Sequence, residues 1–168
     1  MHKYLILPVT FLIAACGGSD DEIASGTFDD GEGNQGSYSV TGDDGNSETV
    51  IQSDGGEVRI ASGDKAVKDL PMGIKIYPGA TIQTSMSGVG DGKSGAMVVL
   101  KTGDSVDEVM SFYRKQLKSK GIEVETEIKS GDMQMIGGDG ADGEGVSVSA
   151  TTSPDGGVTA TIIAGGNG

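Results

Sequence analysis

The sequence predicts an α+β domain in which one helix packs on an antiparallel sheet as a two-layer sandwich. Three observations support this fold class. Residues 105–120 carry helical periodicity together with start and stop signals. Short runs before and after this stretch alternate apolar and polar residues with period two, which is typical of half-buried strands. Glycine, asparagine and aspartate separate the runs, which predicts hairpin connections between neighbouring strands.

The helix is expected to span residues 106–120. Ser105 and Glu108 form a Ser-x-x-Glu capping box, which satisfies N–H groups that are otherwise unpaired at a helix start. Gly121 follows the last turn, where glycine commonly ends a helix in the left-handed conformation. The apolar residues recur at the spacing of a single helix face, and they are Val106, Val109, Met110, Tyr113 and Leu117.

Two strands are expected before the helix and four after it. The first two are joined by a glycine-rich loop at residues 88–95. Residues 96–100 are the most apolar run after residue 15, so their strand is expected centrally in the sheet. The six strands are expected at residues 81–85, 96–102, 122–129, 132–136, 145–152 and 158–163.

The segments before this domain differ in composition. Residues 16–36 are acidic and glycine-rich, so we expect a flexible, disordered tether there. Residues 37–65 contain short alternating runs around Asp54-Gly55-Gly56, a hairpin signature, and predict a small β-meander. A sheet of two or three short strands is only marginally stable alone, so whether the meander folds independently stays open. The expected organisation is therefore 1–15 signal peptide, 16–36 tether, 37–65 meander and 66–165 α+β domain.

The first fifteen residues have the features of an export signal. A basic start at Lys3 is followed by an apolar run of about 12 residues, too short for the roughly 20 that span a bilayer. The run ends in Ile13-Ala14-Ala15-Cys16, which resembles the lipobox of bacterial lipoproteins. This resemblance implies cleavage before Cys16 and acyl lipid, palmitate included, on its thiol. A cysteine with two or more acyl chains is a durable membrane anchor.

Position 17, after the cysteine, indicates where the anchor would lie. An aspartate directly after the cysteine would resemble an inner-membrane retention signal, but this chain has Gly17 there. In a Gram-negative cell we therefore expect the outer membrane, with the protein facing the periplasm. The alternative is an ordinary secretory signal with an incidental cysteine.

Composition excludes several classes of function. After cleavage the chain would contain no histidine, and its single cysteine would be blocked by lipid. Ser-His-Asp and Cys-His catalysis both need an imidazole, so we expect no enzyme. The usual zinc ligands are missing as well. The net charge of −13 becomes about −14 without Lys3, and such a chain repels nucleic acid.

Two glycine-rich segments resemble ligand-binding loops. Residues 90–95 satisfy G-x-G-x-x-G, but an apolar strand follows them where a nucleotide site needs a helix, so we expect a hairpin and no nucleotide. Residues 137–145 resemble one calcium-binding nonapeptide. Its oxygen ligands would be Asp139, Asp142 and Glu144, and only one copy is present. An acidic solvated turn is the stronger interpretation.

The main domain carries a second resemblance. Ile76-Tyr77-Pro78-Gly79-Ala80, followed by a strand and then by Ser111-Phe112-Tyr113-Arg114 and Leu117, is similar to uncharacterised envelope lipoproteins of Gram-negative bacteria. The resemblance spans about residues 70–165 and implies no particular chemistry.

These observations lead to three hypotheses of function. The first is a non-enzymatic lipoprotein that binds or supports another component of the cell envelope. The second is an acidic, calcium-responsive binding module. The third and weakest is a glycan hydrolase that uses two carboxylates facing one cleft.

Overall fold

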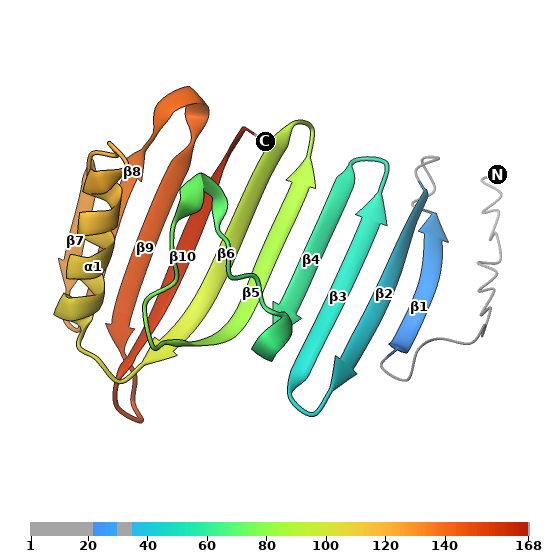
Figure 1. The fold of residues 1–168 in the computed structure, drawn as a ribbon, viewed down its shortest axis with the longest axis horizontal. Helices are drawn as coiled ribbons and strands as arrows, with labels where there is room; N and C mark the ends of the chain where they lie inside the picture. The colour runs from blue at the N-terminus through green and yellow to red at the C-terminus, as the bar shows by residue number, and fades with distance from the viewer. Residues whose placement is uncertain (1–21, 30–34, 168) are drawn as a thin grey trace, which may run out of the picture.

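The computed structural model describes residues 22–29 and 35–167, which form one ten-stranded antiparallel sheet with one α-helix. The strand order is β1-β2-β3-β4-β5-β6-β10-β9-β8-β7 (Figure 1). Successive strands are therefore neighbours, except that the chain leaves β6 through the helix and returns to it with β10. The predicted combination of an antiparallel sheet with one helix is confirmed.

The strands are five to ten residues long, with β7 the shortest. Their bounds are β1 Glu22–Asp29, β2 Gln35–Asp43, β3 Asn46–Ser53, β4 Gly56–Ser62, β5 Thr81–Gly90, β6 Lys93–Thr102, β7 Thr126–Ser130, β8 Met133–Asp139, β9 Gly145–Thr152 and β10 Val158–Asn167. The helix α1 is Val106–Ser119, and the short 3-10 turns are Gly63–Lys65, Pro71–Gly73 and Ala141–Gly143.

The helix has the predicted ends. The Ser105 hydroxyl accepts a hydrogen bond from the Glu108 N–H at 3.3 Å, and the Glu108 carboxylate accepts one from the Ser105 N–H at 2.9 Å. Gly121 follows the helix with a φ of 73°, a conformation that glycine adopts without strain. Both signals read from the sequence are confirmed.

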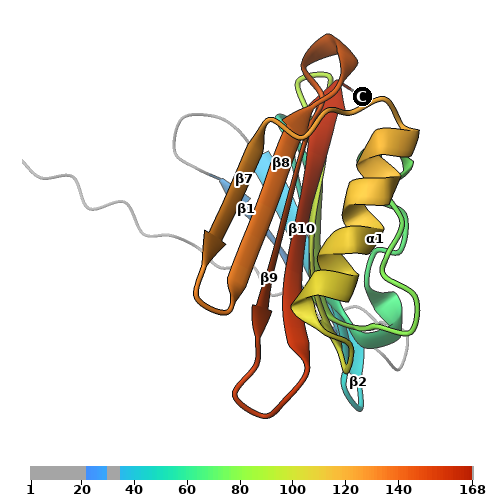
Figure 2. The same ribbon diagram turned by 90° about the vertical axis from the view of Figure 1, so that its left-hand side faces the viewer.

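A single layer covers part of one face of the sheet. The helix contacts β8 and β9, and the turn Pro71–Gly73 contacts β6 and β10. Figure 2 shows the helix and the segment 63–80 on the same side of the sheet, with nothing described on the other side. Buried residues from this layer and from β6, β8, β9 and β10 make up the core. They include Leu70, Ile74, Val98, Leu100, Val109, Met110, Tyr113, Leu117, Ile136, Val148 and Ile162.

The predicted tether was wrong for residues 22–29, which form β1 at one edge of the sheet. Two aromatic rings hold this strand against β2. Phe28 lies over Gly36, where an added Cβ would meet the ring at 2.2 Å, and Tyr38 lies over Gly26, where it would meet the ring at 2.9 Å. The glycines that indicated disorder thus make room for cross-strand aromatic contacts.

The predicted loop at residues 88–95 was also wrong. Both strands continue through it to a two-residue turn at Asp91 and Gly92, whose φ values of 51° and 70° fit a type I′ hairpin. The expected boundary between residues 65 and 66 falls between β4 and β5, which pair with each other in one sheet. The strand over residues 96–100 is central, as predicted.

Candidate binding surface

The two faces of the sheet differ in what covers them. We call the face under α1 and residues 63–80 the helix face and the other the open face. Residues opposite each other in antiparallel strands point to the same side, so the register of the strands assigns each paired position to a face. Ser85 pairs with Val98 on the helix face, and both are buried. Met86 pairs with Met97 on the open face.

A row of mostly apolar residues runs across the middle of the open face, perpendicular to the strands. We call it the central row. From β2 to β9 it consists of Val40, Thr49, Ile60, Met86, Met97, Ile163 and Ser147. Ile60 is 39% exposed, Met86 41% and Ile163 50%. Apolar side chains this exposed, and contiguous, are typical of an interaction surface.

The open face is almost free of carboxylates. The chain has 25 aspartates and glutamates, yet Asp139 is the only one that the described strands place on this face. The basic residues in the same strands on this face are Lys93 and Lys101, and Lys101 forms an ion pair with Asp155. The acidic surface of the molecule is therefore segregated to the loops, the helix and the helix face.

Beside the central row, four adjacent strands carry glycine. We call this the glycine row, and it consists of Gly88 on β5, Gly95 on β6, Gly165 on β10 and Gly145 on β9. Because no side chain projects there, the backbone itself forms the surface. The open face is consequently low along the glycine row and raised along the central row.

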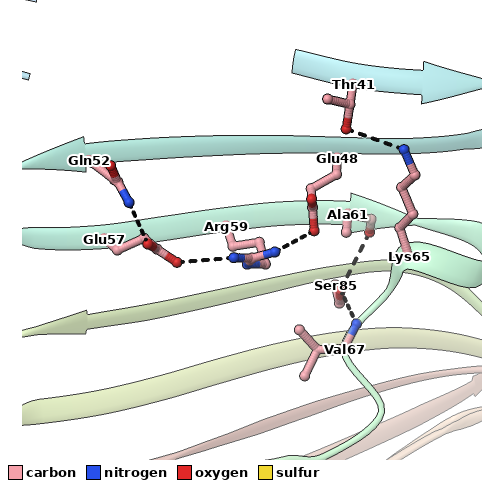
Figure 3. Close-up of polar contacts among 9 residues, drawn as sticks. All are labelled: Thr41, Glu48, Gln52, Glu57, Arg59, Ala61, Lys65, Val67 and Ser85. Atoms are coloured by element: carbon pink, nitrogen blue, oxygen red, sulfur yellow. Dashed lines mark hydrogen bonds and ion pairs between the residues drawn. The ribbon is translucent and has the colours of Figure 1, made fainter. Parts of the chain in front are cut away.

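The helix face of β2–β4 has the opposite character. Arg59 forms ion pairs with Glu48 at 2.6 Å and with Glu57 at 3.3 Å, and Gln52 donates a hydrogen bond to Glu57 at 2.9 Å (Figure 3). The Gln52 hydrogen bond, more than that of Arg59, lowers the pKa of the Glu57 carboxyl. The hydrogen bond that Arg59 donates to Glu48 raises the pKa of the Arg59 guanidinium. These charges satisfy one another at a partly exposed surface, where such pairs add little stability.

Ser85 fastens the covering segment to the sheet. Its buried hydroxyl accepts a hydrogen bond from the Val67 N–H at 2.8 Å and donates one to the Ala61 carbonyl at 3.4 Å (Figure 3). Lys65 contributes a further contact by donating to Thr41 at 3.2 Å. The segment therefore starts on the polar part of the helix face and continues over the core.

Side chains fill the space between helix and sheet. Val109, Met110, Tyr113 and Leu117 are each fully buried against the sheet. Burial raises the pKa of Tyr113, whose hydroxyl makes no hydrogen bond within the described residues. A tightly packed layer of this kind leaves no room for a large ligand between α1 and the strands beneath it.

A shallow hollow of about 450 Å³ lies at the start of the helix, and its lining includes three aspartates. Two of them are already hydrogen-bonded. Asp104 accepts from the Tyr77 hydroxyl at 2.7 Å, and Asp107 accepts from Gln134 at 2.6 Å. The Asp104 contact raises the pKa of Tyr77 to about 12. We assign these carboxylates to the packing of the helix start, and the glycan-hydrolase hypothesis stays a prediction.

The expected calcium ligands lie at one end of the sheet. Asp139 ends β8, and Glu144 precedes β9, where its side chain lies close to Gly166 and Gly140. The side chain of Asp142 is outside the described part of the structure. No group of three or more metal-ligating side chains occurs among the residues that are described. Calcium binding here stays a prediction.

The other sequence-based sites have simple outcomes. Cys16 and the whole expected signal peptide lie outside the described residues. Residues 90–95 form the β5–β6 hairpin, as expected. Of the helices in the described part of the chain, none is long and apolar enough to cross a membrane.

Comparison with known families gives one match. A family model described as START domain-like matches residues 82–157, which hold β6, α1, β7, β8, β9 and nearly all of β5. No curated protein and no solved structure matches the chain. The match covers the part of the sheet that carries the helix. It favours a ligand-binding module and is compatible with binding without catalysis.

Sequence reasoning missed the open face. Alternation along a strand predicts one polar, solvated face, and it does not show that apolar residues of different strands form one exposed surface. One signal was present: residues 96–100 are apolar at every position, a pattern typical of a strand with both faces covered. The structure covers only one of these faces within the described residues.

Proposed function

We propose that this chain is a non-enzymatic lipoprotein, held at the outer membrane by lipid on Cys16, that binds another component of the cell envelope through the open face of its sheet. The open face carries this proposal more than any other feature. It is apolar along the central row, almost free of carboxylates, and uncovered within the described structure.

The location rests on the lipobox. Ile13-Ala14-Ala15-Cys16 follows an apolar run of the right length, and the described sheet begins six residues after the cysteine, at Glu22. Six residues reach at most about 20 Å when fully extended. The β1 edge of the sheet would then lie near the membrane, with the helix-bearing strands farther away.

The absence of catalysis rests on residue types. Without histidine or a free thiol, the expected mature chain lacks the groups that commonly activate nucleophiles. The START domain-like match is in keeping with ligand binding. A binding role also explains why apolar side chains stay exposed on a sheet whose stability does not require them there.

Capture from crosslinked envelopes tests the proposal with a matched pair of variants. The full chain is tagged, and capture by the wild type is compared with Met86→Glu and Val89→Glu. Both positions lie on β5, but Met86 is on the open face, whereas Val89 is on the helix face and 61% exposed. A buried carboxylate without a partner is costly at an interface, so Met86→Glu should lose the captured component.

Val89→Glu is the control for the capture experiment. Val89→Glu adds the same charge to the same strand and should capture as the wild type does. Equal capture by the two variants would contradict a role for the open face, provided that circular dichroism shows both variants folded.

A further inference from the structure

Four neighbouring strands share one pattern on the open face. Each has a glycine, then a central-row residue, then a β-branched or hydroxyl-bearing residue, at steps of two positions. The sets are Gly88, Met86 and Thr84 on β5; Gly95, Met97 and Val99 on β6; Gly165, Ile163 and Thr161 on β10; and Gly145, Ser147 and Ser149 on β9. The register aligns these sets into three parallel rows.

The rows are arranged so that the surface is complementary to itself. A rotation of 180° about an axis along the central row places each strand against its own copy in a second molecule. The glycine row of one copy then faces the row of β-branched or hydroxyl-bearing residues of the other. Gly95 therefore meets Val99 of the second copy, and Gly165 meets Thr161. Small residues opposite larger ones are what face-to-face sheet packing requires. The central row meets itself on the axis.

From this pattern we propose that the partner bound by the open face is a second copy of the same chain, related by a twofold axis along the central row. This inference rests on the proposed function, because it uses the same surface and names its occupant. It makes the contact isologous, as in most closed dimers. Each sheet supplies the second layer that the other lacks.

Charge favours this occupant. Two mature chains, each with a net charge of about −14 once Lys3 is removed from the −13 of the full sequence, repel each other. The open face avoids this, since Asp139 is the only carboxylate that the described strands place there. At the rim Lys93 would face Lys101 of the second copy, whose charge is already paired with Asp155.

Area is sufficient as well. Nine spacings between ten strands extend about 43 Å, and eight residues of strand extend about 26 Å, which gives a face of about 1,100 Å². Stable complexes bury about 800 Å² on each partner. The axis also runs from β1 towards β7, so it keeps the β1 edges of both copies at one end, where two lipid anchors could enter one membrane.

Cysteine crosslinking in intact envelopes tests the arrangement. The sequence has one cysteine, Cys16, so Met86→Cys adds a single new thiol close to the axis. A short bismaleimide should convert Met86→Cys into a covalent dimer. Val89→Cys, on the opposite face of the same strand, should give no more dimer than the wild type. Any dimer that forms through Cys16 would appear equally in the wild type and in both variants, so the comparison corrects for it.

Co-capture in mild detergent provides the second readout. Two differently tagged full chains should copurify as wild type and as Val89→Glu, and at least tenfold less as Met86→Glu. Added salt should strengthen the association because it screens repulsion between the acidic chains. Equal crosslinking at positions 86 and 89, or no copurification of wild-type copies, would overturn the self-association.

The two proposals can fail separately. If Met86→Glu loses a different envelope component while the wild type never copurifies with itself, the open face is a binding surface and the identity of its occupant is wrong. If Met86→Glu changes neither self-association nor capture of other components, the open face has no binding role and both proposals fail.

Discussion

Met86 on β5 lies directly opposite Met97 on β6, on the side of the sheet that no described element covers. The residues next to them in sequence, Ser85 and Val98, pair beneath the helix layer. At this point β5 and β6 therefore carry methionines on the open face and buried side chains on the helix face. A sheet of this kind is usually enclosed between two layers, and only one is present within the described chain. In the proposed dimer, the sheet of a second copy of the chain forms the second layer.

The capping box makes a prediction about stability. Ser105→Ala removes the hydroxyl that accepts from the Glu108 N–H, so the free energy of unfolding should fall by about 1 kcal/mol. The measurement is urea denaturation at pH 7. Ser119→Ala, at the other end of the helix, serves as a control with a smaller expected effect, since its hydroxyl only donates to the Gln116 carbonyl.

The same cap should introduce pH dependence. Its hydrogen bonds from Ser105 lower the pKa of Glu108, so the stabilisation is present above the ordinary value of 4.5 and is lost as the pH falls. The fall in stability between pH 6 and pH 3 should therefore be smaller in Ser105→Ala than in the wild type. An identical acid profile in both proteins would show that the Ser105 hydroxyl does not stabilise the Glu108 carboxylate in solution, because the backbone N–H of residue 105 still donates to it in the variant.

The buried phenol of Tyr113 should make the protein sensitive to alkali. Burial raises the pKa of Tyr113, and the Asp104 contact raises that of Tyr77 from 10.0 to about 12. An unfolded tyrosine loses its proton first, so stability is full below pH 10 and falls as the pH rises towards 12. Tyr113→Phe should reduce this loss, measured as the difference in urea midpoint between pH 8 and pH 11.

Tyr113→Phe should also affect stability at neutral pH. Its hydroxyl is buried without a hydrogen-bond partner in the described part of the protein, so its removal should leave the free energy of unfolding unchanged or raise it by about 1 kcal/mol. A loss of more than 1 kcal/mol would show that the hydroxyl has a partner in solution, such as an ordered water.

The edge strand β1 should open without unfolding the rest. Phe28→Ala removes the ring that packs on Gly36, and no element in the described part of the chain covers β1. Hydrogen exchange followed by mass spectrometry should show faster exchange in residues 22–29 and unchanged protection in β6 and β10. Uniformly faster exchange across the sheet would indicate that β1 is part of a single cooperative unit.

The expected anchor can be tested by phase partitioning. Wild-type chain should enter the detergent phase, and its N-terminal peptide should carry acyl mass on Cys16. Cys16→Ser should accumulate as an uncleaved precursor. A soluble wild type that begins at an unmodified Cys16 would show a freely secreted protein with a reactive thiol instead.

Local signals in the sequence predicted the helix best, because the capping box, the apolar stripe and Gly121 all depend on neighbours within one turn. Hairpins at Asp54-Gly55 and the alternation in β9 were equally local. The strand β1 could not be predicted, because Gly26 on β1 and Gly36 on β2 become favourable only when the rings of Tyr38 and Phe28 lie over them from the neighbouring strand. Such pairing depends on register, which composition does not reveal.

The open face required the whole sheet order. Met86 and Met97 lie on one hairpin, whereas the helix and three strands separate Ile163 from them in sequence. The three residues become one row only through the pairing of β6 with both β5 and β10. Their strands were predicted individually. The return of β10 to the middle of the sheet was not, because alternation indicates a strand but not its neighbour.

A photo-crosslinking amino acid placed at position 86 or at position 89 of the full chain, in living cells, tests the central claim most directly. We expect a discrete crosslinked product from position 86, on the open face, and only scattered background from position 89, on the helix face. A discrete product from position 89 with none from position 86 would contradict the claim that this protein binds through the open face of its sheet.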